Sequence, residues 1–418
     1  METVLGVLVV AVAGLTMGSG VWPMKLMRKF QFEHWWFIGM LLGLIILPWT
    51  ITLVAFPNVI QAYRDVPVSV LVISNLFSIS WGIANVLCAL CFVRIGVALT
   101  GAILTGLGAS ISVIVPMIFK GSGLFKDAPD IGSAAGATVL TGVGVMLIGV
   151  ILASAAGFGR DKELKKLQKT SGSFMGGLIM TIIAGVTSAG IMLAFVYSQG
   201  PIVARVSMVE SGQTIKLGGV QEIKGVISVN PAGYPVDSNG DIVLVFGKNE
   251  EVDVHVGGLT AKAAADRING VIEGKTKAWN QHISVDVPNI FAVFPVQAVG
   301  LLGGALINIL YPAYLMTKRK SWGVLATSGK ECILAAIIGV QFCIAVSLAN
   351  KGMLLLGALG ASVGAGIQQS MQMIGGQGLG FISGEWKGVH GTPRLQMYAA
   401  IVLLIIAASI MAYSNYLK

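Results

Sequence analysis

Apolar runs of membrane-spanning length follow one another along almost the whole chain. A helix needs ~20 apolar residues to cross a hydrocarbon core of ~30 Å, so each run is long enough to span. Two runs, 4–22 and 331–350, are bordered by polar residues. The others contain no Asp, Glu, Lys or Arg: 35–56, 68–93, 97–119, 134–157, 175–198, 291–316, 352–383 and 395–414. The pattern predicts an all-α polytopic membrane protein with about ten transmembrane helices.

One hydrophilic block interrupts these runs and divides the chain into three parts. We expect six helices in 1–198, a soluble insert in 199–290 and four helices in 291–418. Inside the insert, β-branched residues predict strands, and Leu259–Ile272 has helical periodicity. The strand-like runs include Ile202–Met208, Ile242–Gly247, Val252–Val256 and Ile283–Val287. The insert is therefore expected to be a small α+β domain.

The charges indicate which way the helices are threaded. The net charge is +9, although only 11% of residues are charged, and many of the cations stand in short connections between apolar runs. The connections 23–33, 158–174 and 317–320 are the most basic, and they alternate with near-neutral ones. Basic connections stay in the cytoplasm. We therefore expect a multi-pass protein of the cell (inner) membrane, with both termini and 199–290 extracytoplasmic, and no nucleic-acid partner.

The basic connection 158–174 also separates the first five helices from the last five. Secondary transporters are often built from two such repeats with inverted topology, and their substrate site lies at the repeat interface. Both halves carry a glycine-rich fourth run, 97–119 and 352–383. This arrangement favours a bundle of 5+5 inverted repeats.

Several uncharged polar side chains are candidates for binding a substrate inside the bundle. Trp can stack on a sugar ring, whereas Asn and Gln can pair with hydroxyls as both donor and acceptor. Ser78, Trp81 and Asn85 lie along one stripe of the run 68–93. The other candidates are Gln341, Gln368, Gln369 and Gln372. The alternative role for each is to hold helices together, because buried amides in lipid need partners.

No apolar run has a carboxylate in its middle, and the nearest carboxylates stand at the expected cytoplasmic ends of the helices. Glu33, Glu331 and Glu385 are the candidates for proton coupling, and interfacial anchoring is the alternative role. A carboxylate at a low-dielectric boundary can hold a proton near neutral pH, so we expect Glu33 to be the coupling group. The sequence has no P-loop, nucleophile elbow or metal-spaced His/Cys cluster, so we expect neither an enzyme nor a cofactor or metal site.

Short motifs are spread over the apolar runs. They include Pro23-x-Lys25, Phe32-Glu33-x-x-Trp36-x-x-Gly39, Trp81-Gly82-Ile83-x-Asn85, Gly303-Gly304-Ala305-x-Ile307-Asn308 and Gly384-Glu385-Trp386. As a set they resemble the motifs of the L-rhamnose–proton symporter family, in the drug/metabolite transporter superfamily. The resemblance implies ten helices with both termini outside, and uptake of a neutral sugar, L-rhamnose or a related one, by proton symport. The block 199–290 departs from the family, whose members resemble this chain but have a short connection there.

Two other functions remain open at this point. The chain could carry another small metabolite as a transporter of the same superfamily. It could also be a membrane receptor that senses a ligand through the insert, although no large cytoplasmic domain is expected.

Overall fold

The computed structural model describes residues 2–417 with several gaps. The gaps are 96, 120–124, 126–127, 165–173, 211–219, 225–227, 230–234, 237–240, 247–249, 260–262, 264–266, 269, 272–292 and 358–359. All statements below concern the described residues.

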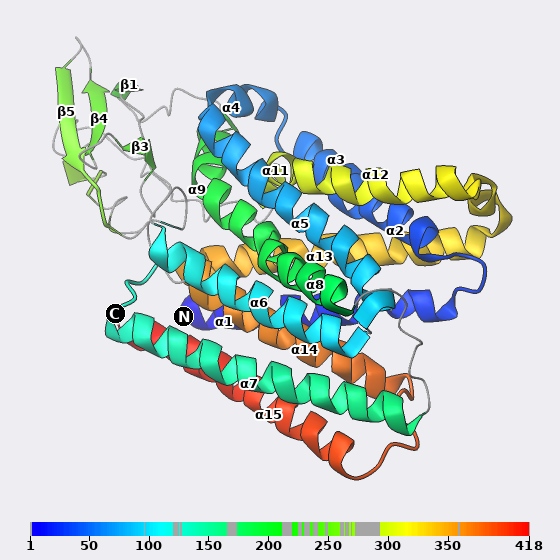
Figure 1. Cartoon of the computed structure of the whole chain (residues 1–418). Helices are drawn as coiled ribbons and strands as arrows, with labels where there is room; N and C mark the ends of the chain where they lie inside the picture. Colours follow the sequence, from blue (N-terminus) through cyan, green and yellow to red (C-terminus); the bar gives the residue numbers. More distant parts are fainter. Residues whose placement is uncertain are drawn as a thin grey trace.

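Helices occupy all ten apolar runs and lie side by side in one bundle (Figure 1). Their bounds are α1 Glu2–Ser19, α2 Phe32–Met40, α3 Leu47–Ala55, α4 Val59–Asp65, α5 Val68–Ile95, α6 Val97–Ile118, α7 Ala134–Glu163, α8 Phe174–Ser188, α9 Gly190–Glu210, α11 Val293–Gly300, α12 Leu302–Arg319, α13 Gly329–Leu356, α14 Ala365–Ile382 and α15 Thr392–Tyr413.

By length and composition, seven helical segments of the described chain can cross a membrane, and an eighth is formed if the bent pair α11–α12 is one span. The bend between α11 and α12 is 56°. The architecture is that of a helical multi-pass membrane protein, as the apolar runs predict. The number ten stays a prediction, because α6 and α14 are helical but do not enter this count.

Two of the runs contain a segment of π-helix. Leu41–Ile46 (η2) lies between α2 and α3, and Gly360–Gly364 (η8) precedes α14. The first of these segments packs closely on α13: a Cβ on Gly43 would lie 2.5 Å from the carbonyl oxygen of Gly339. Such close backbone approach over glycine is how helices pack in lipid, where no hydrophobic force drives them together.

The long helices pack in a few recurring pairs. α7 lies along α15, and α1 lies against both α13 and α14. α5 packs against α8, α9 and α12, and α6 packs against α7 and α8. The two termini and the strands lie at one end of the bundle in Figure 1, whereas the end of α12 and the start of α15 lie at the other.

The insert contains antiparallel strands, as the β-branched runs predict. β4 (Asp241–Phe246) pairs with β5 (Glu250–His255) on one side and with β1 (Val220–Lys224) on the other. A second, two-stranded sheet joins β2 (Ser228–Val229) and β3 (Pro235–Val236). The predicted strand 283–287 and most of the predicted helix 259–272 lie outside the described residues.

The strand predicted at Ile202–Met208 is wrong, because α9 continues as a helix to Glu210. Ile202, Val203 and Val206 are buried in a cluster with Phe56 and Val59. Their spacing of one and four residues places them on one face of a helix. Packing against this cluster overrides the β propensity of the branched side chains.

Candidate functional site

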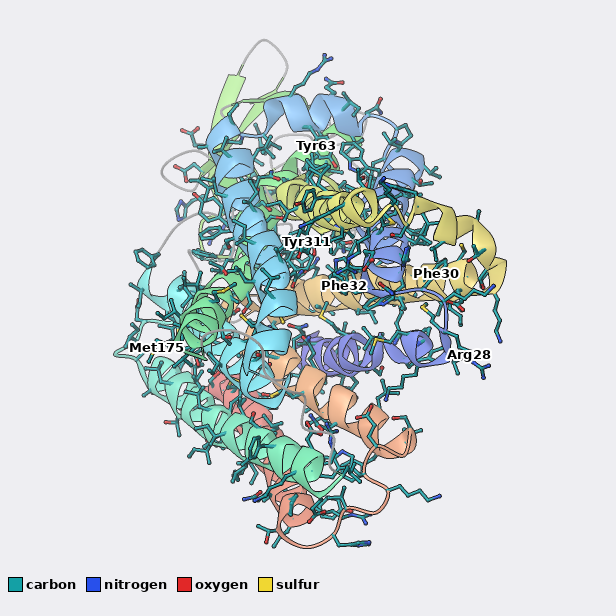
Figure 2. The ribbon with its side chains drawn as sticks, turned by 45° about the vertical axis from the view of Figure 1, so that its right-hand side comes forward. Arg28, Phe30, Phe32, Tyr63, Met175 and Tyr311 are labelled. Atoms are coloured by element: carbon teal, nitrogen blue, oxygen red, sulfur yellow. The ribbon has the colours of Figure 1, made fainter. Side chains whose placement is uncertain are left out.

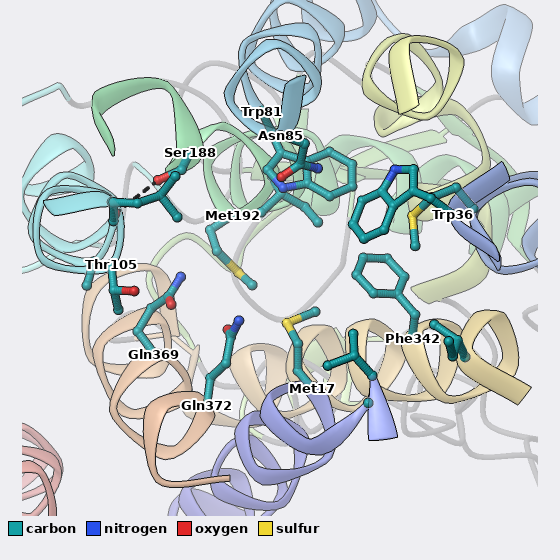
Figure 3. A pocket seen from close by; sticks show the side chains of 18 residues that line it. Met17, Trp36, Trp81, Asn85, Thr105, Ser188, Met192, Phe342, Gln369 and Gln372 are labelled. Atoms are coloured by element: carbon teal, nitrogen blue, oxygen red, sulfur yellow. Dashed lines mark hydrogen bonds between the residues drawn. The ribbon is translucent and has the colours of Figure 1, made fainter. Parts of the chain in front are cut away.

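A cavity of about 230 Å³ lies in the middle of the bundle (Figure 3). Residues of α1, α2, α5, α6, α8, α9, α13 and α14 line it, so segments from both halves of the chain form its walls. None of the described residues that line it carries a charge. We call this space the central cavity.

One side of the central cavity is aromatic. The rings of Trp81 on α5 and Phe342 on α13 stack with 6.2 Å between centroids and 16° between planes. Trp36 on α2 lies beside them, as Figure 3 shows. Flat apolar surfaces of this kind can cover the C–H face of a ring-shaped ligand.

A buried asparagine connects two of these cavity residues. Asn308 on α12 is 1% exposed, and its Oδ1 accepts hydrogen bonds from Trp36 Nε1 at 3.2 Å and from Asn85 Nδ2 at 2.8 Å. Its own Nδ2 donates to the carbonyl oxygen of Gly304, one helical turn earlier, at 2.9 Å. The network holds α2, α5 and α12 together at the aromatic side.

The opposite side carries amides and hydroxyls. Gln369 and Gln372 extend from α14, and Thr105 and Ser188 come from α6 and α8 (Figure 3). Gln372 Oε1 accepts a hydrogen bond from Gln368 Nε2 at 3.4 Å. The cavity therefore offers an apolar surface on one side and hydrogen-bonding groups on the other.

The structure brings four of the predicted binding residues together: Trp81, Asn85, Gln369 and Gln372 line the central cavity. Ser78 does not, because its Oγ donates to Leu301 O at 2.9 Å and accepts from Gly304 N at 2.8 Å, between α5 and α12.

Gln341 and Gln368 are also outside the lining. Gln341 Nε2 donates to Thr16 O at 3.0 Å, and its Oε1 accepts from Trp22 Nε1 at 3.2 Å. Gln368 Nε2 contacts the sulfur of Met17 at 3.1 Å. Gln341 thus joins α13 to α1, and Gln368 joins α14 to α1. This is the helix-holding role that the sequence left open.

Sequence reasoning missed Trp36, Phe342 and Asn308 as members of the site. Trp36 and Asn308 stand inside two of the quoted motifs, and Asn308 is a buried amide in a charge-free run, so a signal for both was present. Phe342 follows Gln341 in an apolar run, and nothing in the local pattern distinguishes it from a lipid-facing residue.

The three candidate carboxylates lie outside the central cavity, at the end of the bundle opposite the strands. Glu33 is 1% exposed, and Arg319 Nη1 donates to both of its oxygens at 2.8 and 2.9 Å. This pair connects the start of α2 to the end of α12.

Glu331 and Glu385 are held differently. Glu331 accepts hydrogen bonds from the backbone N–H groups of Arg28, Lys29 and Phe30, the last at 2.7 Å. Arg28 and Phe30, which lie in the segment between α1 and α2, are labelled in Figure 2. Glu385 forms ion pairs with Lys25 and with Arg160, the latter at 3.0 Å. All three carboxylates thus bind segments that are remote in sequence.

Comparison with known proteins identifies relatives of the chain. The family model for the L-rhamnose-proton symport protein matches residues 2–215, about half of the chain. An L-rhamnose-proton symporter of Yersinia pestis bv. Antiqua is 30% identical over 172 residues, which cover 41% of this chain and 49% of that protein. A symporter of the same name from Yersinia pseudotuberculosis serotype O:1b is 30% identical over 172 residues, 48% of its length.

The alignment spans about half the length of these curated relatives. The matched region, 2–215, includes α1 to α9 and therefore Trp36, Trp81 and Asn85 of the central cavity. On the extent of the family match, the chain belongs to the L-rhamnose-proton symport protein family.

Proposed function

We propose that the protein is a secondary transporter that takes up a neutral sugar, L-rhamnose or a related one, by proton symport. The central cavity is the observation that carries this proposal. It is uncharged along its described lining, aromatic on one side and rich in amides on the other. A charged substrate would lose its hydration there without gaining a partner, whereas a polyol can pair its hydroxyls with amides.

The size of the cavity also supports a small substrate. At about 230 Å³ it is below the ~300–1,000 Å³ that is usual for drug-sized ligands. A space of this size suits a single sugar ring better than an oligosaccharide.

The packing of the helices supports two repeats of five around this cavity. α1 packs on α13 and α14, and the sixth segment, α8–α9, packs on α5 and α6. Exchanging the first five segments for the last five maps one set of contacts onto the other. α7 and α15, the fifth and tenth segments, pack on each other. Rocking of two such repeats around a fixed site is the usual basis of alternating access.

For coupling we propose Glu33 rather than Glu331 or Glu385. Glu33 is buried and is paired with Arg319 among the described residues, so its protonation would break the ion pair that joins the start of α2 to the end of α12. Glu331 is fixed by three backbone donors, and the side chain of Glu385 is 40% exposed between two cations. Those two arrangements suit anchoring of the connections between helices.

The transport proposal is tested by uptake into proteoliposomes. The purified protein should accumulate L-rhamnose or another neutral monosaccharide from a radiolabelled panel when the outside is acidic, and a protonophore should abolish accumulation. Accumulation of a charged metabolite instead, with no sugar uptake under any gradient, would overturn the proposal in favour of a transporter for another small molecule.

The coupling proposal is tested with Glu33→Gln, which keeps the shape of the side chain but cannot titrate. We expect sugar exchange between the two sides to persist while accumulation driven by a pH gradient is lost. Glu385→Gln serves as the matched control, because it removes a carboxylate from the same end of the bundle. Equal accumulation in Glu33→Gln and wild type would eliminate Glu33 as the coupling group.

A further inference from the structure

The Asn308 side chain has one orientation that its partners permit. An indole nitrogen can only donate a hydrogen bond, so the atom that faces Trp36 Nε1 at 3.2 Å must be the acceptor Oδ1. The Gly304 carbonyl can only accept, so the atom that faces it at 2.9 Å must be Nδ2. Two independent partners therefore fix the same assignment of the amide.

This assignment in turn fixes the orientation of the Asn85 amide. The Asn85 amide has one atom 2.8 Å from Asn308 Oδ1. Because Oδ1 is an acceptor, the atom that faces it must be the donor, Asn85 Nδ2. A turned Asn85 would place two carbonyl oxygens in contact. With its Nδ2 directed toward Asn308, Asn85 has its Oδ1 left for the central cavity, which it lines (Figure 3).

We propose that Asn308 is a positioning residue that presents Asn85 to the substrate as a hydrogen-bond acceptor. Asn308 does not line the cavity; it orients Asn85 and also accepts a hydrogen bond from Trp36. The proposal rests on the proposed function, because it states how a sugar hydroxyl is recognised at that same site. The hydroxyl that reaches Asn85 must donate its hydrogen.

The far side of the cavity offers the amides of Gln369 and Gln372. No donor-only or acceptor-only group among the described partners fixes the orientation of Gln372, which pairs with the amide of Gln368 at 3.4 Å. The fixed acceptor is therefore the one on α5. A site that pairs a substrate hydroxyl discriminates strongly against an analogue that leaves the partner unpaired.

Deoxy and fluoro-deoxy analogues separate these two kinds of contact. Replacing a hydroxyl by hydrogen removes donor and acceptor, whereas replacing it by fluorine removes the donor alone and keeps much of the size. Binding of L-rhamnose and of its singly substituted analogues is measured by calorimetry on the purified full chain in detergent. At one ring position we expect both replacements to weaken binding by roughly 10- to 100-fold, as for an unpaired buried acceptor.

The Asn308→Leu variant should remove this discrimination. Without Asn308, the Asn85 amide is free to turn, so the penalty at that one position should shrink to about threefold or less while other positions keep their pattern. Asn308→Asp in its protonated form retains a carbonyl acceptor for Trp36 and Asn85 and a hydroxyl that can donate to Gly304 O, and it should preserve the penalty.

Asn75→Leu is the matched control. Asn75 also joins α5 to α12, donating to Val299 O at 2.8 Å and accepting from Gly303 N at 2.7 Å, but it lies outside the cavity lining. Its loss should lower stability without changing the pattern among analogues. A general packing role for Asn308 would make the two leucine variants behave alike.

Three outcomes would overturn the inference. The penalty could be unchanged in Asn308→Leu, or Asn75→Leu could shift it equally. The third outcome is that every fluoro analogue binds to the wild-type protein as well as the parent sugar does. Failure of the wild type to bind any neutral sugar is a different result, because it removes the proposed function and the inference with it.

Discussion

Ser78 and Trp81 lie one helical turn apart on α5, yet their surroundings differ. Trp81 stacks on Phe342 and lines the central cavity. Ser78 is buried between α5 and α12, donates to Leu301 O and accepts from Gly304 N. The two residues belong to one stripe of the sequence but face different neighbours in the structure. Trp81 faces the cavity, whereas Ser78 faces α12 and has a packing role.

Substitutions on this stripe should separate affinity from stability. We expect Trp81→Ala and Asn85→Ala to weaken sugar binding at least tenfold, because they remove the stacking surface and the acceptor. Ser78→Ala leaves the Gly304 N–H without its partner and should cost ~1–3 kcal/mol of stability, with affinity within about threefold of wild type. Calorimetry and thermal unfolding in detergent measure the two effects. Normal binding by the Trp81→Ala/Asn85→Ala double variant would assign both residues to packing instead.

At the scale of elements, glycine sets how closely helices approach. Gly339 on α13 is in backbone contact with α2, since a Cβ there would lie 2.5 Å from the Gly39 carbonyl oxygen. Gly14 and Gly18 on α1 similarly face the backbone of α14 at Gln368 and Gln372. These contacts place α1 and α14 so that Gln372 reaches the cavity.

We expect Gly339→Ala to lower the melting temperature in detergent, because the added carbon must separate α13 from α2. Gly144→Ala on α7 is the control: no atom lies within 4 Å of the position that an added Cβ would take, and alanine favours a helix by ~1 kcal/mol over glycine. The control should be neutral or more stable. Equal melting temperatures for the two variants would show that α2 and α13 can part without loss.

At the scale of the whole molecule, the ion pairs of Glu385 lie at one end of the bundle. Lys25 and Glu385 come from two connections and Arg160 from the last turn of α7, and their ion pairs bring these distant segments together. The strands and both termini lie at the other end (Figure 1). The positive-inside rule predicts that the ion-paired end is cytoplasmic.

Single cysteines in a variant without the native Cys88, Cys91, Cys332 and Cys343 test this orientation. Asp253→Cys on β5 should react with an impermeant maleimide in intact cells. Lys320→Cys and Lys387→Cys at the other end should react only after the membrane is opened; all three positions are exposed. Labelling of Lys320→Cys alone in intact cells would reverse the assigned topology.

Removal of the insert tests the division of the chain. Replacing 211–292 by a short Gly/Ser linker should leave a folded bundle, because Val206 and Val293 belong to the same buried cluster on neighbouring helices. A deletion that begins at 199 should fail, since it removes the buried face of α9. Comparable yield and melting temperature for both deletions would contradict this boundary.

The sequence by itself determined the membrane class, the places of the helices and the family. It could do so because a helix that crosses a hydrocarbon core needs a long charge-free run, and such a run consists of consecutive residues. It also supplied Trp81, Asn85, Gln369 and Gln372 as polar or aromatic groups in such runs.

Only the tertiary structure decided which of these groups face one cavity. Whether Ser78, Gln341 and Gln368 hold helices or line a site depends on how α1, α12 and α13 pack against them, and no local pattern encodes that rotation. The helical state of Ile202–Met208 was decided in the same way, by a buried cluster built from distant segments. The single acceptor that Asn85 presents depends on Asn308, 223 residues away.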